Sequence, residues 1–428
     1  MRLKNYKKLL LCILLILLLN LLCFNYSYAE EEPALEINSP SALLMDYNTG
    51  KILYEKNINE KMYPASLTKV LTAIVVLENA SLDQTATVSY DSVMNIPYGY
   101  VTANLQIDEE LTVEQLLYVL MVGSSNDAAV VLAENIAGSV ENFSEMMNEK
   151  AKEIGCTNTH FINPNGEHDE NHYSTAYDLA LIAKYAMQNE TFRNLVSTTS
   201  YKLPATNKYD KDDRVFTTTN ALLMVNNNDR LDNYYYKYAI GIKTGFTTPA
   251  GNCLIAAAKK DDLELITVVL GAGQTEDGLS CRYLDTISLF NYGYSNYTLK
   301  EVTSKGNTIQ TTNIKGATRK TKQLDLIAEN DIYVLDKSSN SNPIMPQVTL
   351  DSKIKAPIKQ GEIVGSVTYT AQGIDYTTNL LAKNNVQKSY WLLKFLLFVF
   401  LVFIYLLYLD YKKRMKRKKR LENLRKIR

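Results

Sequence analysis

The chain has 428 residues, of which 46% are hydrophobic and 21% are charged, and its formal net charge is zero. This length predicts two folded domains with accessory segments. The charges are unevenly distributed, because residues 30–389 contain 30 basic and 44 acidic side chains, a net charge of −14. That acidic balance argues against nucleic acid as a partner, since affinity for nucleic acid depends on basic groups that neutralise phosphates.

The N-terminus has the pattern of a secretory signal peptide. Four basic residues lie within the first eight positions, residues 9–23 form an apolar run, and Ser27-Tyr28-Ala29 supplies small residues at cleavage-site spacing. This order predicts a signal peptide over residues 1–29. The alternative is an uncleaved N-terminal anchor.

Residues 34–296 change from strand patterns to helix patterns and back to strand patterns along the chain. Residues 41–56 predict a hairpin around Asn48-Thr49-Gly50. Helical periodicity follows from Ser66 to about Glu190; examples are Leu67–Leu77, Val113–Met121, Ala128–Ala137 and Leu179–Met187. Strands return within residues 238–271, at Tyr238–Lys243, Cys253–Ala258 and Leu265–Leu270, and a helix is expected near Tyr283–Tyr292. We therefore predict an α+β domain over residues 34–296, with an antiparallel sheet flanked by helices.

Beyond Tyr297 the pattern changes to short strands separated by Gly, Pro, Asn and Asp. The expected strands are Thr308–Thr312, Ile332–Leu335, Val348–Leu350 and Ile363–Tyr369. They predict a small all-β domain over residues 297–382, followed by a polar linker at 383–389.

Residues 390–409 predict a transmembrane helix. Twenty residues at ~1.5 Å each span ~30 Å, the thickness of the hydrocarbon core. Lys412 to Arg428 then contains eleven Lys or Arg and one Glu. Because basic flanks stay on the cytoplasmic side, we expect a cytoplasmic tail at 410–428 and, on a single-pass membrane protein, extracytoplasmic folded domains between the two hydrophobic segments.

Neither the cysteines nor the histidines predict a metal or disulfide site. Outside the signal peptide there are three cysteines, an odd number, so no disulfide framework is expected. The histidines are His160, His168 and His172. Because a zinc site needs three or four convergent ligands, we interpret them as surface-loop residues and expect no metal and no cofactor.

Three short motifs carry the candidate chemistry. Ser66-Leu67-Thr68-Lys69 places Ser66 and Lys69 three residues apart, on one face of a helix. A serine needs a base to become nucleophilic, and a lysine becomes that base when burial or a nearby cation favours its neutral form. This motif alone is a weak signal.

The second and third motifs are Ser124-Ser125-Asn126, between two helical segments, and Lys243-Thr244-Gly245, at the end of an apolar strand. Ser124-Ser125-Asn126 could relay a proton and hold an amide. Lys243-Thr244-Gly245 presents a charge and a hydroxyl to a carboxylate, and its glycine leaves room for a peptide at a strand edge. All three motifs in this order are the set of serine β-lactamases and penicillin-binding proteins.

From about Leu35 to Tyr369 the chain resembles the D-alanyl-D-alanine carboxypeptidases of peptidase family S11. The resemblance rests on YPASLTK, SSNDAA, FINPNGEHDENHYSTAYDLA (161–180), TNALL (219–223), GIKTGFTTPAGNCL (241–254) and KAPIKQGEIVGSV (355–367). Two departures are Ser125, where the family commonly has Gly, and Glu167, where an apolar residue is usual.

The resemblance implies a serine β-lactamase/transpeptidase-like core and a role for each motif residue. Ser66 would be the acylated nucleophile and Lys69 its base, with Ser124 and Asn126 completing the proton network. Lys243 and Thr244 would bind the terminal carboxylate of a stem peptide or of a β-lactam, with Arg282 assisting, and Gly245 would leave room for the substrate. The backbone N–H groups of Ser66 and Phe246 would form the oxyanion hole.

Two other functions remain open at this point. A serine β-lactamase would need a glutamate that activates the deacylating water, and residues 126–243 show no convincing segment for it; sustained nitrocefin turnover would identify one. A non-catalytic β-lactam sensor or wall-binding scaffold need not be acylated, so fluorescent penicillin labelling would distinguish it.

Overall fold

The computed structural model describes residues 35–225, 234–352 and 354–425. Its core is a five-stranded antiparallel sheet with the strand order β2-β1-β9-β8-β7. The strands are β1 (Ser41–Asp46), β2 (Ile52–Lys56), β7 (Ala239–Thr247), β8 (Gly251–Lys260) and β9 (Leu263–Ala272). The signal peptide predicted at 1–29 lies outside the described residues.

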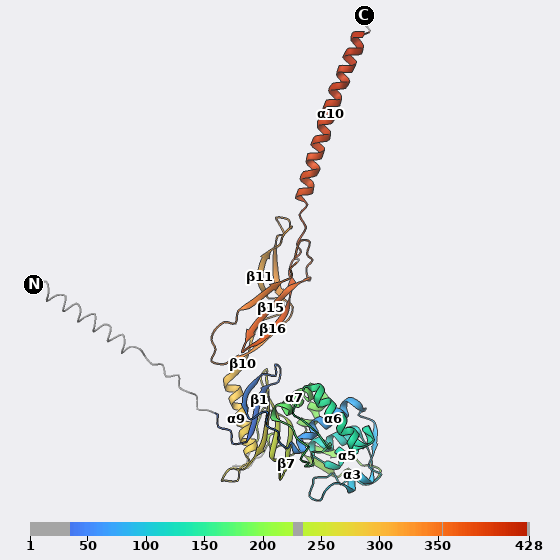
Figure 1. The fold of residues 1–428 in the computed structure, drawn as a ribbon, viewed down its shortest axis with the longest axis vertical. Coiled ribbons are helices and arrows are strands. Elements are labelled where there is room, and N and C mark those ends of the chain that lie inside the picture. The colour runs from blue at the N-terminus through green and yellow to red at the C-terminus, as the bar shows by residue number, and fades with distance from the viewer. Residues whose placement is uncertain (1–34, 226–233, 353, 426–428) are drawn as a thin grey trace, which may run out of the picture.

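Both faces of this sheet are buried, and alternate residues of β1 show why. Ala42 and Leu44 pack into the hydrophobic cluster under α9 (Cys281–Asn296), whereas Leu43 and Met45 pack into the larger cluster of the other helices. Because side chains alternate across a strand, a strand buried on both faces is apolar throughout. The sheet is therefore a layer between α9 and the helical part of the domain (Figure 1).

The helical part lies between β2 and β7 in the chain. Its helices are α2 (Lys69–Asn79), α3 (Tyr90–Met94), α4 (Val113–Val122), α5 (Asn126–Ala137), α6 (Val140–Ile154), α7 (Ala176–Ala186) and α8 (Glu190–Ser197). The 3₁₀ turns η1 (Ala65–Thr68) and η2 (Ala221–Leu223) complete it, together with an antiparallel pair, β3 (Thr85–Thr87) with β4 (Glu110–Thr112), and a hairpin, β5 (Ser200–Leu203) with β6 (Arg214–Thr217). Local capping fixes several starts: Thr112 and Gln115 form a capping box on α4, and Thr175 caps α7. The expected α+β core is confirmed.

Several elements differ from the sequence predictions. Helix α8 and the β5–β6 hairpin were not expected, because they lie at and beyond the end of the helical stretch predicted from Ser66 to about Glu190 and before the strands predicted from residue 238. Lys243 lies in the middle of β7 rather than at the end of a strand, since the strand continues to Thr247. The Lys243 side chain is buried there, beside the candidate site described below.

The C-terminal domain is all β, as predicted. Its strands are β10 (Tyr297–Thr303), β11 (Thr308–Asn313), β12 (Gln323–Ala328), β13 (Ile332–Lys337), β14 (Pro346–Leu350), β15 (Ile363–Ala371) and β16 (Ile374–Ala382). They form a five-stranded sheet, β11-β12-β16-β15-β14, and a β10–β13 pair. Residues 383–388, expected in the linker, lie against this domain: Val386 is buried and pairs with Ile358.

The chain ends in a long helix, α10 (Trp391–Arg425). It points away from the α+β core at the far end of the β domain (Figure 1). Within the described residues it is the one helix long and apolar enough to cross a membrane. The helix continues beyond residue 409 into the basic segment because Lys and Arg are good helix formers.

Candidate active site

A pocket of about 600 Å³ lies where η1, the start of α5 and β7 meet. Seven of the nine residues expected from the sequence line it: Ser66, Ser124, Asn126, Thr244, Gly245, Phe246 and Arg282. The other two, Lys69 and Lys243, are almost fully buried, at 0% and 1% exposure. Segments as much as 216 positions apart, from Ser66 to Arg282, therefore meet at one site.

Lys69 contacts the candidate nucleophile directly. It is the first residue of α2, and its Nζ atom lies 3.0 Å from the Ser66 Oγ atom. The same Nζ donates to the Asn126 Oδ1 atom at 2.8 Å and to the Asn165 carbonyl oxygen at 2.6 Å. Each side chain is held by short local structure, η1 for Ser66 and α2 for Lys69.

The environment of Lys69 favours its neutral form. Complete burial lowers the pKa of Lys69 well below its ordinary value, and the nearby charge of Lys243 lowers it further, against a smaller opposing effect of Asp127. A neutral amine has two N–H groups, which the two carbonyl oxygens of Asn126 and Asn165 accept. Its lone pair then faces the Ser66 hydroxyl and can take its proton.

Gly166 and Gly245 allow two segments to lie directly against the backbone of residues 64–66. A Cβ atom at Gly245 would lie 3.0 Å from the Pro64 carbonyl oxygen and 3.2 Å from the Ser66 backbone nitrogen. At Gly166, which has a φ of +82°, a Cβ atom would lie 1.9 Å from the Ala65 carbonyl oxygen. Side chains at either position would push the strand or the loop away from the Ser66 backbone.

The Ser124–Asn126 motif forms the opposite wall. Ser124 has a φ of +61°, a left-handed conformation that turns the chain between α4 and α5. The Asn126 backbone N–H and side-chain Nδ2 both donate to the Val101 carbonyl oxygen at 2.9 Å. This orientation leaves Oδ1 of Asn126 free to accept from Lys69.

Lys243 and Arg282 make one end of the pocket cationic. Burial, together with a smaller effect of the Arg282 charge, lowers the pKa of Lys243 to about 7. Arg282 donates from Nη1 to the Gly245 carbonyl oxygen at 3.3 Å. Such a pair of cations beside the Thr244 hydroxyl can bind a carboxylate, whose charge would restore the proton of Lys243.

Tyr283 organises this end of the pocket from behind. The Arg282 guanidinium lies 4.8 Å from the centre of the Tyr283 ring. The Tyr283 hydroxyl donates to the Thr219 carbonyl oxygen at 3.0 Å, and the Thr219 Oγ1 atom lies 2.5 Å from the Thr244 Oγ1 atom. Tyr283 thereby contacts both Arg282 and the segment that supports Thr244.

His172 corrects one of the sequence expectations. It is 2% exposed rather than on a surface loop, because its ring bridges two segments and packs edge-on against Phe161. Its Nδ1 atom accepts from the Ile162 backbone at 3.2 Å, and its Nε2 atom lies 2.8 Å from the Thr68 Oγ1 atom, whose own proton goes to the Ala65 carbonyl oxygen. Nε2 therefore donates, and the ring supports η1 in its neutral form.

Sequence reasoning missed the partners that act through the backbone. The carbonyl oxygens of Val101 and Asn165 carry no side-chain signal, so only the assembled fold shows them. Asp127 had a faint signal, as the residue after Asn126; its carboxylate accepts from the Ala103 backbone at 2.9 Å and the Leu105 backbone at 3.2 Å. Among the described residues, no group of three or more His, Cys, Asp or Glu could hold a metal.

Comparison with known proteins gives a consistent picture. The family model described as D-alanyl-D-alanine carboxypeptidase matches residues 27–274, and that of the penicillin-binding protein 5 C-terminal domain matches residues 297–388. The chain belongs to the D-alanyl-D-alanine carboxypeptidase family. Members of this S11 family are serine-type hydrolases and penicillin-binding proteins that act on the D-Ala-D-Ala end of peptidoglycan.

Individual carboxypeptidases align with this chain over most of their length. The D-alanyl-D-alanine carboxypeptidase DacF of Bacillus subtilis is 31% identical over 83% of this chain and 87% of its own. DacA of Haemophilus influenzae is 30% identical over 82% of this chain and 86% of its own. The crystal structure of penicillin-binding protein 5 from Haemophilus influenzae is 29% identical, covers 82% of this chain and 98% of its own, and superposes with a TM-score of 0.63.

Proposed function

We propose that this carboxypeptidase removes the terminal D-alanine from peptidoglycan stem pentapeptides through an acyl-enzyme on Ser66. The observation that carries the proposal is the 3.0 Å contact between the Ser66 Oγ atom and the buried Lys69 Nζ atom. Lys69 accepts the hydroxyl proton as Oγ attacks the carbonyl carbon of the D-Ala-D-Ala peptide bond. The backbone N–H groups of Ser66 and Phe246 donate to the oxygen that becomes negative.

The remaining residues orient the peptide and complete proton transfer. Lys243, Thr244 and Arg282 bind the terminal carboxylate, while Gly245 lets the peptide lie along β7. The Ser124 hydroxyl passes the proton from Lys69 to the leaving amine, while Asn126 holds the Lys69 amine and the substrate amide. The C–N bond then breaks, D-alanine leaves, and water hydrolyses the Ser66 ester to release the shortened peptide.

A β-lactam would follow the same first step with a different outcome. Its lactam amide acylates Ser66 and its carboxylate occupies the Lys243 end of the pocket. Because the ring ties the leaving nitrogen to the acyl group, the leaving group stays in the pocket and hinders the approach of water. The expected product is a slowly hydrolysed covalent adduct.

The chain's two ends support a membrane-anchored arrangement with the catalytic domain outside the cell. Residues 1–29 are proposed as a signal peptide, 34–296 as the catalytic domain, 297–382 as the β domain, 390–409 as the membrane span and 410–428 as a cytoplasmic tail. The basic C-terminal segment favours this orientation, because Lys and Arg beside a membrane span stay on the cytoplasmic side. Protease protection of a C-terminal tag in sealed spheroplasts tests it, and digestion of the tag from outside would reverse it.

Mass spectrometry of two samples tests the reaction. A pentapeptide ending in D-Ala-D-Ala should lose one alanine, and benzylpenicillin should add its mass to a peptide containing Ser66. The Ser66→Ala variant should do neither while remaining folded. Labelling of that variant would place the nucleophile elsewhere, and sustained nitrocefin hydrolysis by the wild type would favour a β-lactamase.

A further inference from the structure

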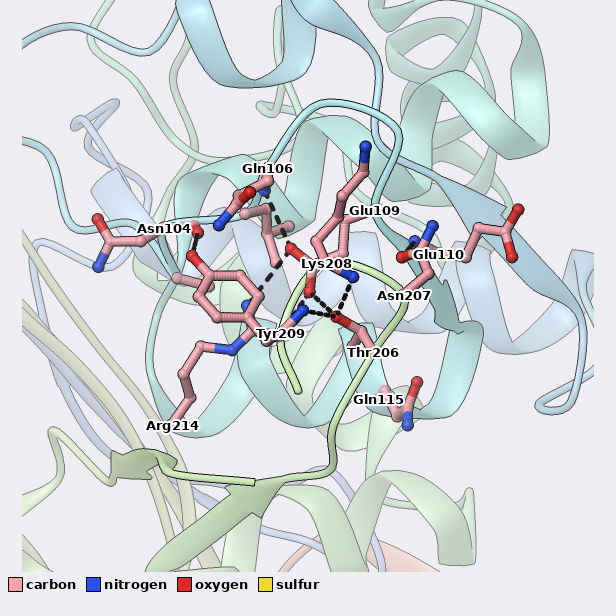
Figure 2. Close-up of polar contacts among 12 residues, drawn as sticks. Asn104, Gln106, Glu109, Glu110, Gln115, Thr206, Asn207, Lys208, Tyr209 and Arg214 are labelled. Carbon is pink, nitrogen blue, oxygen red and sulfur yellow. Dashed lines mark hydrogen bonds and ion pairs between the residues drawn. The ribbon is translucent and has the colours of Figure 1, made fainter. Parts of the chain in front are cut away.

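A buried ion pair lies outside the pocket, between Glu109 and Arg214 (Figure 2). Glu109 is fully buried, and its carboxylate accepts from the Arg214 guanidinium, from the Thr206 hydroxyl at 2.8 Å and from the Gln106 backbone N–H at 2.9 Å. None of these residues lines the pocket. Both oxygens of the Glu109 carboxylate nevertheless accept hydrogen bonds.

Several further contacts around this pair join two segments, residues 104–110 and residues 204–214 (Figure 2). The Tyr209 hydroxyl donates to the Asn104 carbonyl oxygen at 2.7 Å, and its ring stacks on the Arg214 guanidinium at 3.8 Å. Asn207 donates to the Asp108 carbonyl oxygen and accepts from the Glu110 N–H, both at 2.8 Å. The loop of the β5–β6 hairpin is thus fastened to the loop before β4.

The first of these segments runs directly into one wall of the pocket. Asp127 holds the backbone of Ala103 and Leu105, and the Val101 carbonyl oxygen receives both N–H donors of Asn126. Any shift of this segment is therefore transmitted to the Asn126 amide. That amide supplies one of the two acceptors that hold the Lys69 amine toward Ser66.

The second segment runs into the opposite wall. Arg214 begins β6, and two residues after this strand Thr219 lines the pocket and contacts the Thr244 hydroxyl. Phe216 of the same strand packs closely on Gly123, next to Ser124. The hairpin therefore supports both the carboxylate-binding end and the turn that carries Ser124.

A buried ion pair is a weak source of stability, because removing two charges from water offsets most of their attraction. It does fix geometry, since a carboxylate and a guanidinium fork bind in one orientation. We propose that Glu109 and Arg214 are positioning residues that set the spacing of the two pocket walls and so hold Asn126 against Lys69. This inference rests on the proposed role of Ser66 as nucleophile.

The test measures the second-order acylation constant of the full-length protein in detergent micelles with a fluorescent penicillin. Counting labelled molecules at completion expresses the constant per active molecule. Arg214→Met and Glu109→Gln should lower it at least tenfold, and Arg214→Lys, which keeps the charge but loses the fork, should recover part of the loss. Labelling of each variant on Ser66 at long times would show that the chemistry itself survives.

A matched control breaks an exposed ion pair on the same hairpin. Lys202 and Asp212 lie 2.8 Å apart with side chains 59% and 64% exposed, so Asp212→Asn should leave acylation within twofold. If a buried variant fails to fold, Thr206→Val, which removes one donor to Glu109, should still slow acylation two- to fivefold. Unchanged acylation in folded variants, with only a lower melting temperature, would overturn the inference; absence of Ser66 labelling in the wild type would instead refute the proposed nucleophile.

Discussion

Lys69 and Lys243 are both buried in one site, and the charge of Lys243 lowers the pKa of Lys69. The two lysines therefore need opposite protonation states. Lys69 can accept the Ser66 proton only as a neutral amine, whereas Lys243 can bind a carboxylate ion best as an ammonium. Their proximity helps both requirements, because protonating one site disfavours protonating the other.

This division predicts a bell-shaped pH profile for kcat/KM. Activity rises with pH as Lys69 loses its proton and falls again as Lys243, with a pKa of about 7, loses its own. Steady-state hydrolysis of a D-Ala-D-Ala peptide, measured in steps from about pH 5 to about pH 10, should place the basic limb near neutrality. A basic limb near the ordinary lysine pKa of 10.5 would contradict this assignment.

The Lys243→Arg variant separates the two limbs. Arginine stays protonated across this range, so the basic limb should move to higher pH. The acid limb should stay low, because a permanent charge still disfavours protonation of Lys69. We expect the maximal kcat/KM to fall about tenfold, since a fork in place of a point charge shifts the bound carboxylate. A basic limb unchanged from wild type would assign it to another group.

Gly245→Ala tests the close approach of β7 to the nucleophile. The added Cβ atom would meet the backbone of Pro64 and Ser66 at 3.0 and 3.2 Å, so one segment must move by a few tenths of an ångström. Small displacements of reacting groups cost up to ~100-fold in rate, and we expect acylation to fall about tenfold or more. Gly273→Ala is the control, since its Cβ atom meets nothing within 4 Å. Equal acylation in both variants would argue against tight positioning.

His172 predicts a loss of stability in acid. Burial lowers the pKa of His172 from 6.5 to about 4. Between these pH values the unfolded chain binds a proton that the folded chain does not, so the free energy of unfolding falls as pH decreases, by about 3 kcal/mol in total. Denaturant unfolding at several pH values measures it. His172→Gln keeps a donor and an acceptor without titrating, so its unfolding free energy should fall less; identical slopes would exclude His172 as the cause.

The sequence predicted the elements whose patterns are local. The hairpin at 41–56, the helix after Ser66 and the strand leading to Lys243 all have regular apolar periods, and each is present. Helix α8 was missed because it is short, and its buried residues Phe192, Leu195 and Val196 span little more than one turn. The register of Lys243 in mid-strand was missed because β7 continues through residues that resemble a turn.

The candidate site divides in the same way. Ser66, Lys69 and the other motif side chains could be named from the sequence because their chemistry lies in residue type and spacing. The acceptors at Val101 and Asn165 could not, since every residue has a carbonyl group and only the tertiary fold selects which one faces Lys69. Burial of His172 was equally inaccessible, because it depends on packing between segments.

Tyr283→Phe tests whether carboxylate recognition is organised from behind the pocket. The substitution keeps the ring under Arg282 but removes the hydroxyl that donates to Thr219 and accepts from the Ala221 N–H at 3.3 Å. Leaving two buried groups unpaired costs roughly 1–3 kcal/mol, and the resulting shift of Thr219 should weaken its contact with Thr244. We therefore expect KM for a peptide with a free terminal carboxylate to rise about five- to tenfold, which corresponds to about 1–1.4 kcal/mol, the low end of that range.

The control for this prediction is the same peptide with its carboxylate converted to a primary amide. The amide lacks the charge that Lys243, Thr244 and Arg282 recognise, so wild type and Tyr283→Phe should process it with similar, low efficiency. Tyr236→Phe, which removes a hydroxyl bonded to Asn291 at 3.1 Å, provides a second control and should leave both substrates unaffected. An equal loss toward acid and amide in Tyr283→Phe would mean that the hydroxyl supports the fold of the pocket in general, because only a carboxylate-specific loss follows from displacing Thr219.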